Sequence, residues 1–219
     1  MTLNELRASL SNRTRLLEIL AVVLTGLGKF LLVDYYHLKF WYVTIACLSW
    51  TLYILYRIKA DPTLPEYWGF RREGFVSSLK VVLPVAMAAI TAFVIIGNAN
   101  DTLIFNRHLL PILILYPLWA TIQQFLIIGI IARNLDDFEN KDIPKTVILA
   151  VASTIFSVVH YPSIPLMVAT LFLAMFYTVL YLKYRNLWVL GLFHGWLGGL
   201  FYYFVLGRDP WLEFIQAVQ

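Results

Sequence analysis

Seven long apolar runs constrain the fold of this chain more than any other feature of its sequence. Most of them are long enough for an α-helix that crosses about 30 Å of hydrocarbon, the thickness of a bilayer core. The fifth run is short, and Pro162 and Pro165 follow it closely, which predicts a tight turn after it. The runs cover residues 16–33, 40–56, 79–97, 108–132, 146–160, 165–182 and 187–206.

The composition favours a membrane protein. Hydrophobic residues make up 60% of the 219 residues and charged residues 14%, and the mean hydropathy is +0.73. A water-soluble globule of this size cannot bury so much apolar surface. We therefore predict an all-α, polytopic membrane helix bundle with about seven transmembrane helices, in which residues 1–219 form a single integral membrane domain.

The basic residues predict the orientation of the chain. Thirteen of the 17 Lys and Arg residues flank the runs on one side, and the positive-inside rule places that side, with the N-terminus, in the cytoplasm. In a bacterium this multi-pass protein would lie in the plasma (inner) membrane. Because the positive charge is spread over several loops, it favours contact with membrane lipid over binding of nucleic acid. The thirteen residues are Arg7, Arg13, Arg15, Arg57, Lys59, Arg71, Arg72, Lys80, Arg133, Lys141, Lys145, Lys183 and Arg185.

A few polar side chains interrupt the apolar runs. Gln123 and Gln124 are adjacent in the fourth run, and two later runs carry His160 and His194. Burying an amide in hydrocarbon costs free energy unless the protein supplies a hydrogen-bond partner. These four residues together therefore indicate a polar interior. Taken singly, each of them is also typical of a contact between two membrane helices.

Other residues in the runs have structural interpretations. We expect Glu18, Lys29 and Asp34, near the ends of the first run, to lie at the membrane interface. A stripe of small residues that recurs every four positions predicts that another helix approaches the seventh run closely. The stripe is formed by Gly191, Gly195 and Gly199.

The spacing of the polar residues resembles a known family. The sequence Gln-Gln-Phe-Leu-Ile-Ile-Gly at 123–129 is followed by Phe-Ser-Val-Val-His at 156–160 and by His-Gly-Trp-Leu-Gly at 194–198. This order resembles the CPBP family, the CAAX-protease and bacteriocin-processing membrane proteins that include the type II CAAX prenyl endopeptidases. Its pattern is Glu-Glu-x-x-x-Arg on one helix, Phe-x-x-x-His on a second and His-x-x-x-Asn on a third. The resemblance covers residues 109–206, which it implies to be a CPBP-like catalytic core.

Several residues fit the family pattern directly. Phe156 and His160 fit the second motif, His194 fits the start of the third, and Gly129 matches a glycine common after the first. In the family, a Glu of the first motif is understood to activate the attacking water, the histidines assist it, and the Asn stabilises the oxyanion. The resemblance implies catalytic roles for the histidines and a place for Phe156 in the substrate-binding cavity.

The departures fall on catalytic side chains. Gln123 and Gln124 stand where the family has two Glu, Ile128 stands for the Arg, and Gly198 stands for the Asn. Absence of both the Arg and the Glu is physically consistent, because a buried Arg without its carboxylate partner would be an unpaired charge. The resemblance implies that Gln123 and Gln124 occupy the catalytic position. It also implies that Gly198 lies in the substrate-binding cavity.

The substitutions limit the chemistry that these positions support. A neutral amide orients a water but cannot deprotonate it near pH 7, so the base would be His160 or His194. Two histidines can bind zinc, but a catalytic zinc usually has three protein ligands, and no third His or carboxylate is obvious near them. We therefore expect no metal and no cofactor.

Three functions fit these observations. The first is an intramembrane endopeptidase of the CPBP type that cleaves peptide bonds of membrane-associated or lipidated substrates. The second is a non-catalytic relative that binds a peptide, a lipid or a membrane partner in the same cavity. The third is a small transporter or membrane assembly factor, although transporters more often show internal repeats, and none is visible here. Whether the chain is an enzyme stays open at this point.

Overall fold

The computed structural model describes residues 10–139 and 142–218, so Arg7 and Lys141 of the basic set lie outside the described residues. Every regular element in these ranges is helical, which confirms the all-α prediction. The described helices are α2 (Asn12–Gly28), the π-helical η1 (Lys29–Tyr35), α3 (Lys39–Ala60), α4 (Leu64–Trp68), α5 (Phe75–Ala99), α6 (Leu109–Gln124), the π-helical η2 (Phe125–Ala132), α7 (Arg133–Asp136), α8 (Lys145–Val158), α9 (Ile164–Tyr184), α10 (Leu187–Leu200), the π-helical η3 (Phe201–Val205) and α11 (Pro210–Val218).

Several helices have the length and composition of membrane spans. Within the described ranges, five helical segments are long and apolar enough to cross a bilayer, so the chain is an integral membrane helix bundle. Two of the predicted runs, α3 and the shorter α8, are helical but fall outside this set. The count of seven spans and the cytoplasmic N-terminus therefore stay predictions. The five segments are Asn12–Tyr35, Phe75–Ala99, Leu109–Asp136, Ile164–Tyr184 and Leu187–Val205.

The chain divides into two compact units. Unit 1 comprises Met1–Arg71 and Phe125–Arg185, and its described helices are α2, η1, α3, α4, η2, α7, α8 and α9. Unit 2 comprises Arg72–Gln124 and Asn186–Gln219, with α5, α6, α10, η3 and α11. Each unit therefore combines segments that are far apart in the sequence.

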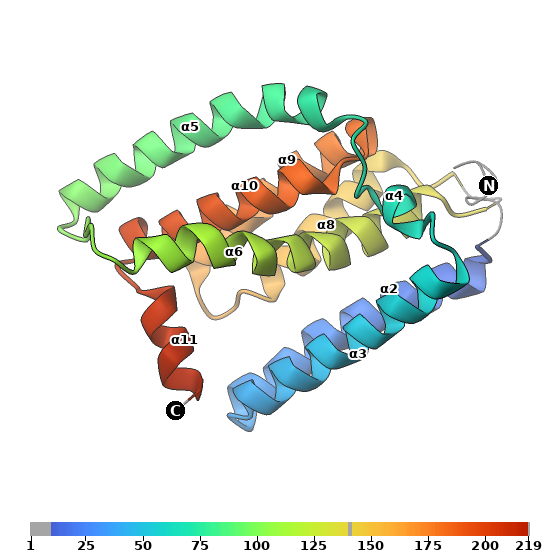
Figure 1. Cartoon of the computed structure of the whole chain (residues 1–219), viewed down its shortest axis with the longest axis horizontal. Coiled ribbons are helices and arrows are strands. Elements are labelled where there is room, and N and C mark those ends of the chain that lie inside the picture. Colours follow the sequence, from blue (N-terminus) through green and yellow to red (C-terminus); the bar gives the residue numbers. More distant parts are fainter. Residues whose placement is uncertain (1–9, 140–141, 219) are drawn as a thin grey trace. The chain divides into compact units, whose positions relative to one another are not determined.

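In unit 2, α10 lies along α6 (Figure 1). A Cβ atom added at Gly195 would lie 2.3 Å from the Cα of Pro117, and one added at Gly191 would lie 2.2 Å from the hydroxyl oxygen of Thr121. Non-bonded atoms do not approach so closely, so only glycine permits this helix separation. The stripe of small residues is thereby confirmed as a helix contact.

A hydrogen bond between the same two helices compensates for the proline inside α6. Pro117 has no backbone N–H, so the carbonyl of Leu113 loses the donor that an α-helix would supply. The indole N–H of Trp196, on α10, donates to that carbonyl at 3.0 Å. This contact satisfies a backbone group that hydrocarbon could not solvate.

In unit 1, α2 and α3 run side by side and share a buried ion pair (Figure 1). Glu18, which we expected at the interface, is only 5% exposed. Its carboxylate accepts from the guanidinium of Arg57 and from the hydroxyl of Tyr53, and it accepts from the amide of Asn134 at 2.6 Å. Partners on α3 and α7 therefore hold this charge inside the protein, whereas its position at the membrane interface stays a prediction.

A second polar cluster in unit 1 joins α2, α4 and α7. The hydroxyl of Tyr67 accepts from Arg15 at 3.0 Å and donates to Asp137 at 2.7 Å, and Asp137 forms an ion pair with Arg133. Burial raises the pKa of Tyr67, so its hydroxyl stays protonated and able to donate. The short α4 is therefore fixed to two other helices through one side chain.

The turn between α8 and α9 is short, as the two prolines predict. Helix α8 ends at Val158 and α9 begins at Ile164. The hydroxyl of Ser157 donates to the carbonyl of Met167 at 2.8 Å, so the two helices are hydrogen-bonded to each other next to the turn. His160 lies inside this turn.

The glycine contact predicts different outcomes for two neighbouring substitutions. Gly195→Ala forces a methyl group against the backbone of Pro117, and we expect a loss of about 1–3 kcal/mol of stability. Gly198→Ala is the matched control, because its Cβ would meet nothing closer than 3.5 Å. The measurement is the apparent melting temperature of each purified variant in detergent. Equal melting temperatures for the two variants would contradict the close packing of α10 on α6.

Candidate functional site

Gln124 is the last residue of α6 and is completely buried. Residues spaced by four lie on one face of a helix, and Ala120, Tyr116 and Ile112 precede Gln124 at this spacing. Ile112 and Ala120 are also buried. Gln123, about 100° further round the helix, is only half-buried. The helical period therefore gives the two adjacent glutamines different surroundings.

The side chain of Gln124 meets His194 of α10. The amide Nε2 of Gln124 lies 3.1 Å from Nδ1 of His194, and His194 is only 4% exposed. Both residues belong to unit 2, so the structure brings two of the predicted site residues together. The stripe of small residues allows this contact, because it sets the distance between α6 and α10.

We assign the protons of His194 from this hydrogen bond. An amide nitrogen can only donate, so Nδ1 of His194 is the acceptor. In a neutral imidazole the proton is then on Nε2, which becomes a donor. The hydrogen bond from Gln124 therefore selects the tautomer of His194 in which Nε2 is the donor.

Gly198 lies one helical turn after His194 and faces its ring. A Cβ atom at this position would lie 3.6 Å from Nε2 of His194 and 3.7 Å from the ring of Tyr116, both ordinary contact distances. The position thus has room for a side chain, unlike Gly195. Tyr116 was not predicted as a site residue, but counting back from Gln124 in steps of four residues would have found it.

One polar atom of the pair has no partner. The Oε1 atom of Gln124 is buried and accepts no hydrogen bond from the described residues. A buried carbonyl oxygen without a donor is costly, and such groups in proteins usually bind water or a ligand. The pair therefore offers a ligand one acceptor, Oε1 of Gln124, beside the imidazole ring of His194.

His160 lies in unit 1, together with Phe156. Its Nδ1 atom is 2.6 Å from the carbonyl oxygen of Phe156, and its ring packs edge-on against the Phe156 ring. Because a carbonyl only accepts, Nδ1 carries the proton, and Nε2 of the neutral ring keeps its lone pair. His160 thus has the opposite tautomer to His194 and is suited to accept a proton.

Lys29 fixes the turn that carries His160. Its ammonium donates to the backbone carbonyl of Tyr161 at 2.6 Å and forms an ion pair with Asp34 at 2.7 Å. No pattern in the sequence indicates the contact of Lys29 with Tyr161, because 132 residues separate the two. Lys29 therefore connects the end of the first helix to the α8–α9 turn.

The remaining predicted residues lie as follows. Gln123 is in unit 2, and its side chain forms no hydrogen bond with the described part of the chain. Ile128, in place of the family's Arg, is completely buried in η2 of unit 1. Among the described residues, no three His, Cys, Asp or Glu side chains gather as a metal site would require.

The helices and the buried amide–imidazole pair define an integral membrane protein with a polar site in its interior. Residues 105–200 match the family model described as type II CAAX prenyl endopeptidase Rce1-like. This part of the chain is therefore similar to the CAAX-protease-like membrane endopeptidases, which confirms the resemblance seen in the motif spacing. No curated protein and no solved structure matches the chain.

The contact of Lys29 with the turn is open to a direct test. Lys29→Met removes the donor to Tyr161, and a hydrogen bond from a charged donor contributes about 1.5–3 kcal/mol. We expect amide hydrogen exchange of Tyr161 and Ser163 to become about tenfold faster or more. Asp34→Asn is the control, because it removes the ion pair and keeps the bond from Lys29 to Tyr161. Unchanged exchange in Lys29→Met would show that the turn is held by other contacts.

Proposed function

We propose that this chain is a membrane endopeptidase that cleaves peptide bonds of membrane-associated, lipidated substrates with an imidazole as the base. The observation that carries the proposal is the buried contact of Gln124 with His194. It lies inside the segment that matches the endopeptidase family, where the motif spacing in the sequence resembles the family's first and third motifs. The amide replaces the carboxylate but still contacts the histidine.

The resemblance to the family implies a catalytic role for His160, and we propose that it is the base. The family's second motif carries this histidine, and the bond from its Nδ1 to Phe156 leaves Nε2 able to take a proton from water. The resulting hydroxide adds to the carbonyl carbon of the scissile peptide bond. When the C–N bond breaks, the proton passes from Nε2 to the leaving amine, so His160 returns to its neutral form.

We assign the oxyanion donor to His194. Addition of hydroxide turns the carbonyl oxygen into an anion, which a positioned N–H group stabilises. Gly198 cannot supply the amide that the family has in its third motif, but Nε2 of His194 lies beside the same position. Gln124 holds this nitrogen as the donor and offers Oε1 to a water molecule or to an N–H of the substrate.

The name of the matching family and the apolar helices of this chain both support a lipidated substrate. The matching family is named for prenyl endopeptidases, and helices of this chain are long and apolar enough to span a bilayer. A peptide that carries a lipid would be concentrated at the membrane where the protein lies. We therefore propose lipidated peptides as substrates.

A cleavage assay on the purified full chain with a library of prenylated peptides tests the proposal. We expect His160→Ala and His194→Ala each to lower turnover by at least about 100-fold. Gln124→Leu keeps the volume but removes the partner that orients His194, and we expect a loss of about 10–100-fold, as for other residues that orient a functional histidine. His37→Asn is the matched control, because His37 is exposed and lies in the loop between η1 and α3.

Two results would contradict the proposal. Turnover that survives both His160→Ala and His194→Ala would place the chemistry on other residues. If the wild type shows no turnover but still binds the peptide, the protein is a non-catalytic relative. This is the second candidate function, and it is favoured by Gln124, which stands where the family pattern has a Glu.

A further inference from the structure

A groove outside the candidate site lies between two helices of unit 1. It has a volume of about 420 Å³ and is lined by the start of α8 and the last turns of α9. This volume is within the range of about 300–1,000 Å³ that is typical of small-molecule sites. The lining residues are Lys145, Thr146, Leu149, Val179, Leu182 and Lys183.

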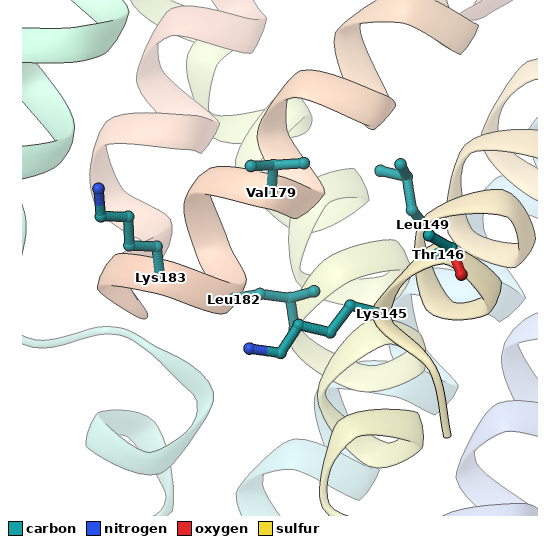
Figure 2. A pocket seen from close by; sticks show the side chains of 6 residues that line it. All are labelled: Lys145, Thr146, Leu149, Val179, Leu182 and Lys183. Atoms are coloured by element: carbon teal, nitrogen blue, oxygen red, sulfur yellow. The ribbon is translucent and has the colours of Figure 1, made fainter. Parts of the chain in front are cut away.

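The groove combines an apolar wall with two positive charges. Leu149, Val179 and Leu182 supply hydrocarbon, and Figure 2 shows the Lys145 side chain extending from α8 towards Leu182 and Lys183 on α9. Neither Lys145 nor Lys183 forms an ion pair with any described carboxylate, Asp142 included. Both lysines thus border the groove without a carboxylate partner among the described residues.

We propose that this groove binds an anionic phospholipid. The phosphate would lie at Lys145 and Lys183, and one acyl chain would lie along Leu149, Val179 and Leu182. Two uncompensated ammonium groups favour a headgroup with net negative charge over a zwitterionic one. The apolar wall favours a lipid over a free phosphate ion, which would leave that surface uncovered.

The position of the groove within the two helices supports this occupant. Lys145 is the first residue of α8 and Lys183 is the next-to-last residue of α9, so both charges lie at helix ends. Lysine at the end of a membrane helix typically reaches the headgroup layer while its methylene groups cover apolar surface. Val179 lies one turn before Lys183 and is 53% exposed, as expected for a side chain in contact with an acyl chain.

Native mass spectrometry of the full chain with phosphatidylglycerol and phosphatidylcholine of the same acyl chains tests the proposal. We expect phosphatidylglycerol to bind at least tenfold more tightly to the wild type. Lys145→Gln/Lys183→Gln removes both charges and should abolish this preference. Lys59→Gln/Lys80→Gln is the matched control, because it removes the same charge from exposed lysines outside the groove and should keep the preference.

A third variant distinguishes lipid binding in the groove from non-specific attraction of an anionic lipid to the two lysines. Leu149→Trp fills the groove and keeps both lysines, so it should weaken phosphatidylglycerol binding at least tenfold. The proposal is overturned if both double variants lose the preference equally, if Leu149→Trp binds as the wild type does, or if the two lipids bind alike. Displacement of the lipid by millimolar glycerol phosphate would overturn it too, because it would indicate a site for a soluble anion.

Discussion

Glycines allow α10 to lie so close to α6 that a Cβ atom at Gly195 would overlap the backbone of Pro117. This approach brings the ring of His194 within hydrogen-bond distance of the Gln124 amide and the indole of Trp196 within reach of the Leu113 carbonyl. Helices in a membrane gain little from burying apolar surface against each other, so close packing and such hydrogen bonds hold them together. The candidate site is therefore a consequence of how these two helices pack.

Many polar groups inside the bundle have hydrogen-bond partners, and Gln124 Oε1 is among the buried atoms of the described residues that lack one. Arg57 and Asn134 satisfy the carboxylate of Glu18, as Trp196 satisfies the carbonyl that Pro117 leaves without a donor. The Oε1 atom of Gln124 has no such donor within the described residues. An amide that served only to join two helices would be expected to use both of its ends, whereas an amide that binds a water or a substrate keeps one of them available.

Parts of this arrangement could be predicted from the sequence, and the parts that could not share a physical reason. The four-residue stripe that includes Gly195 follows from the helical period, which is local. Gln124 and His194 could be predicted as site residues because the order and spacing of their motifs resemble a known family. The burial of Glu18 could not be predicted, because its partners Arg57 and Asn134 are 39 and 116 residues away. The sequence also could not separate Gln123 from Gln124, since the packing of α10 decides which face of α6 is buried.

The account depends most on a neutral His194 that accepts from Gln124 at Nδ1 and carries its proton on Nε2. Nitrogen-15 NMR of the protein labelled at histidine measures this directly, with His194 assigned from its absence in His194→Asn. The account predicts a single tautomer in the wild type, with a protonated Nε2, and loss of that preference in Gln124→Leu while Gln123→Leu leaves it unchanged. A protonated Nδ1 in the wild type, or the same His194 signals in Gln124→Leu, would contradict it.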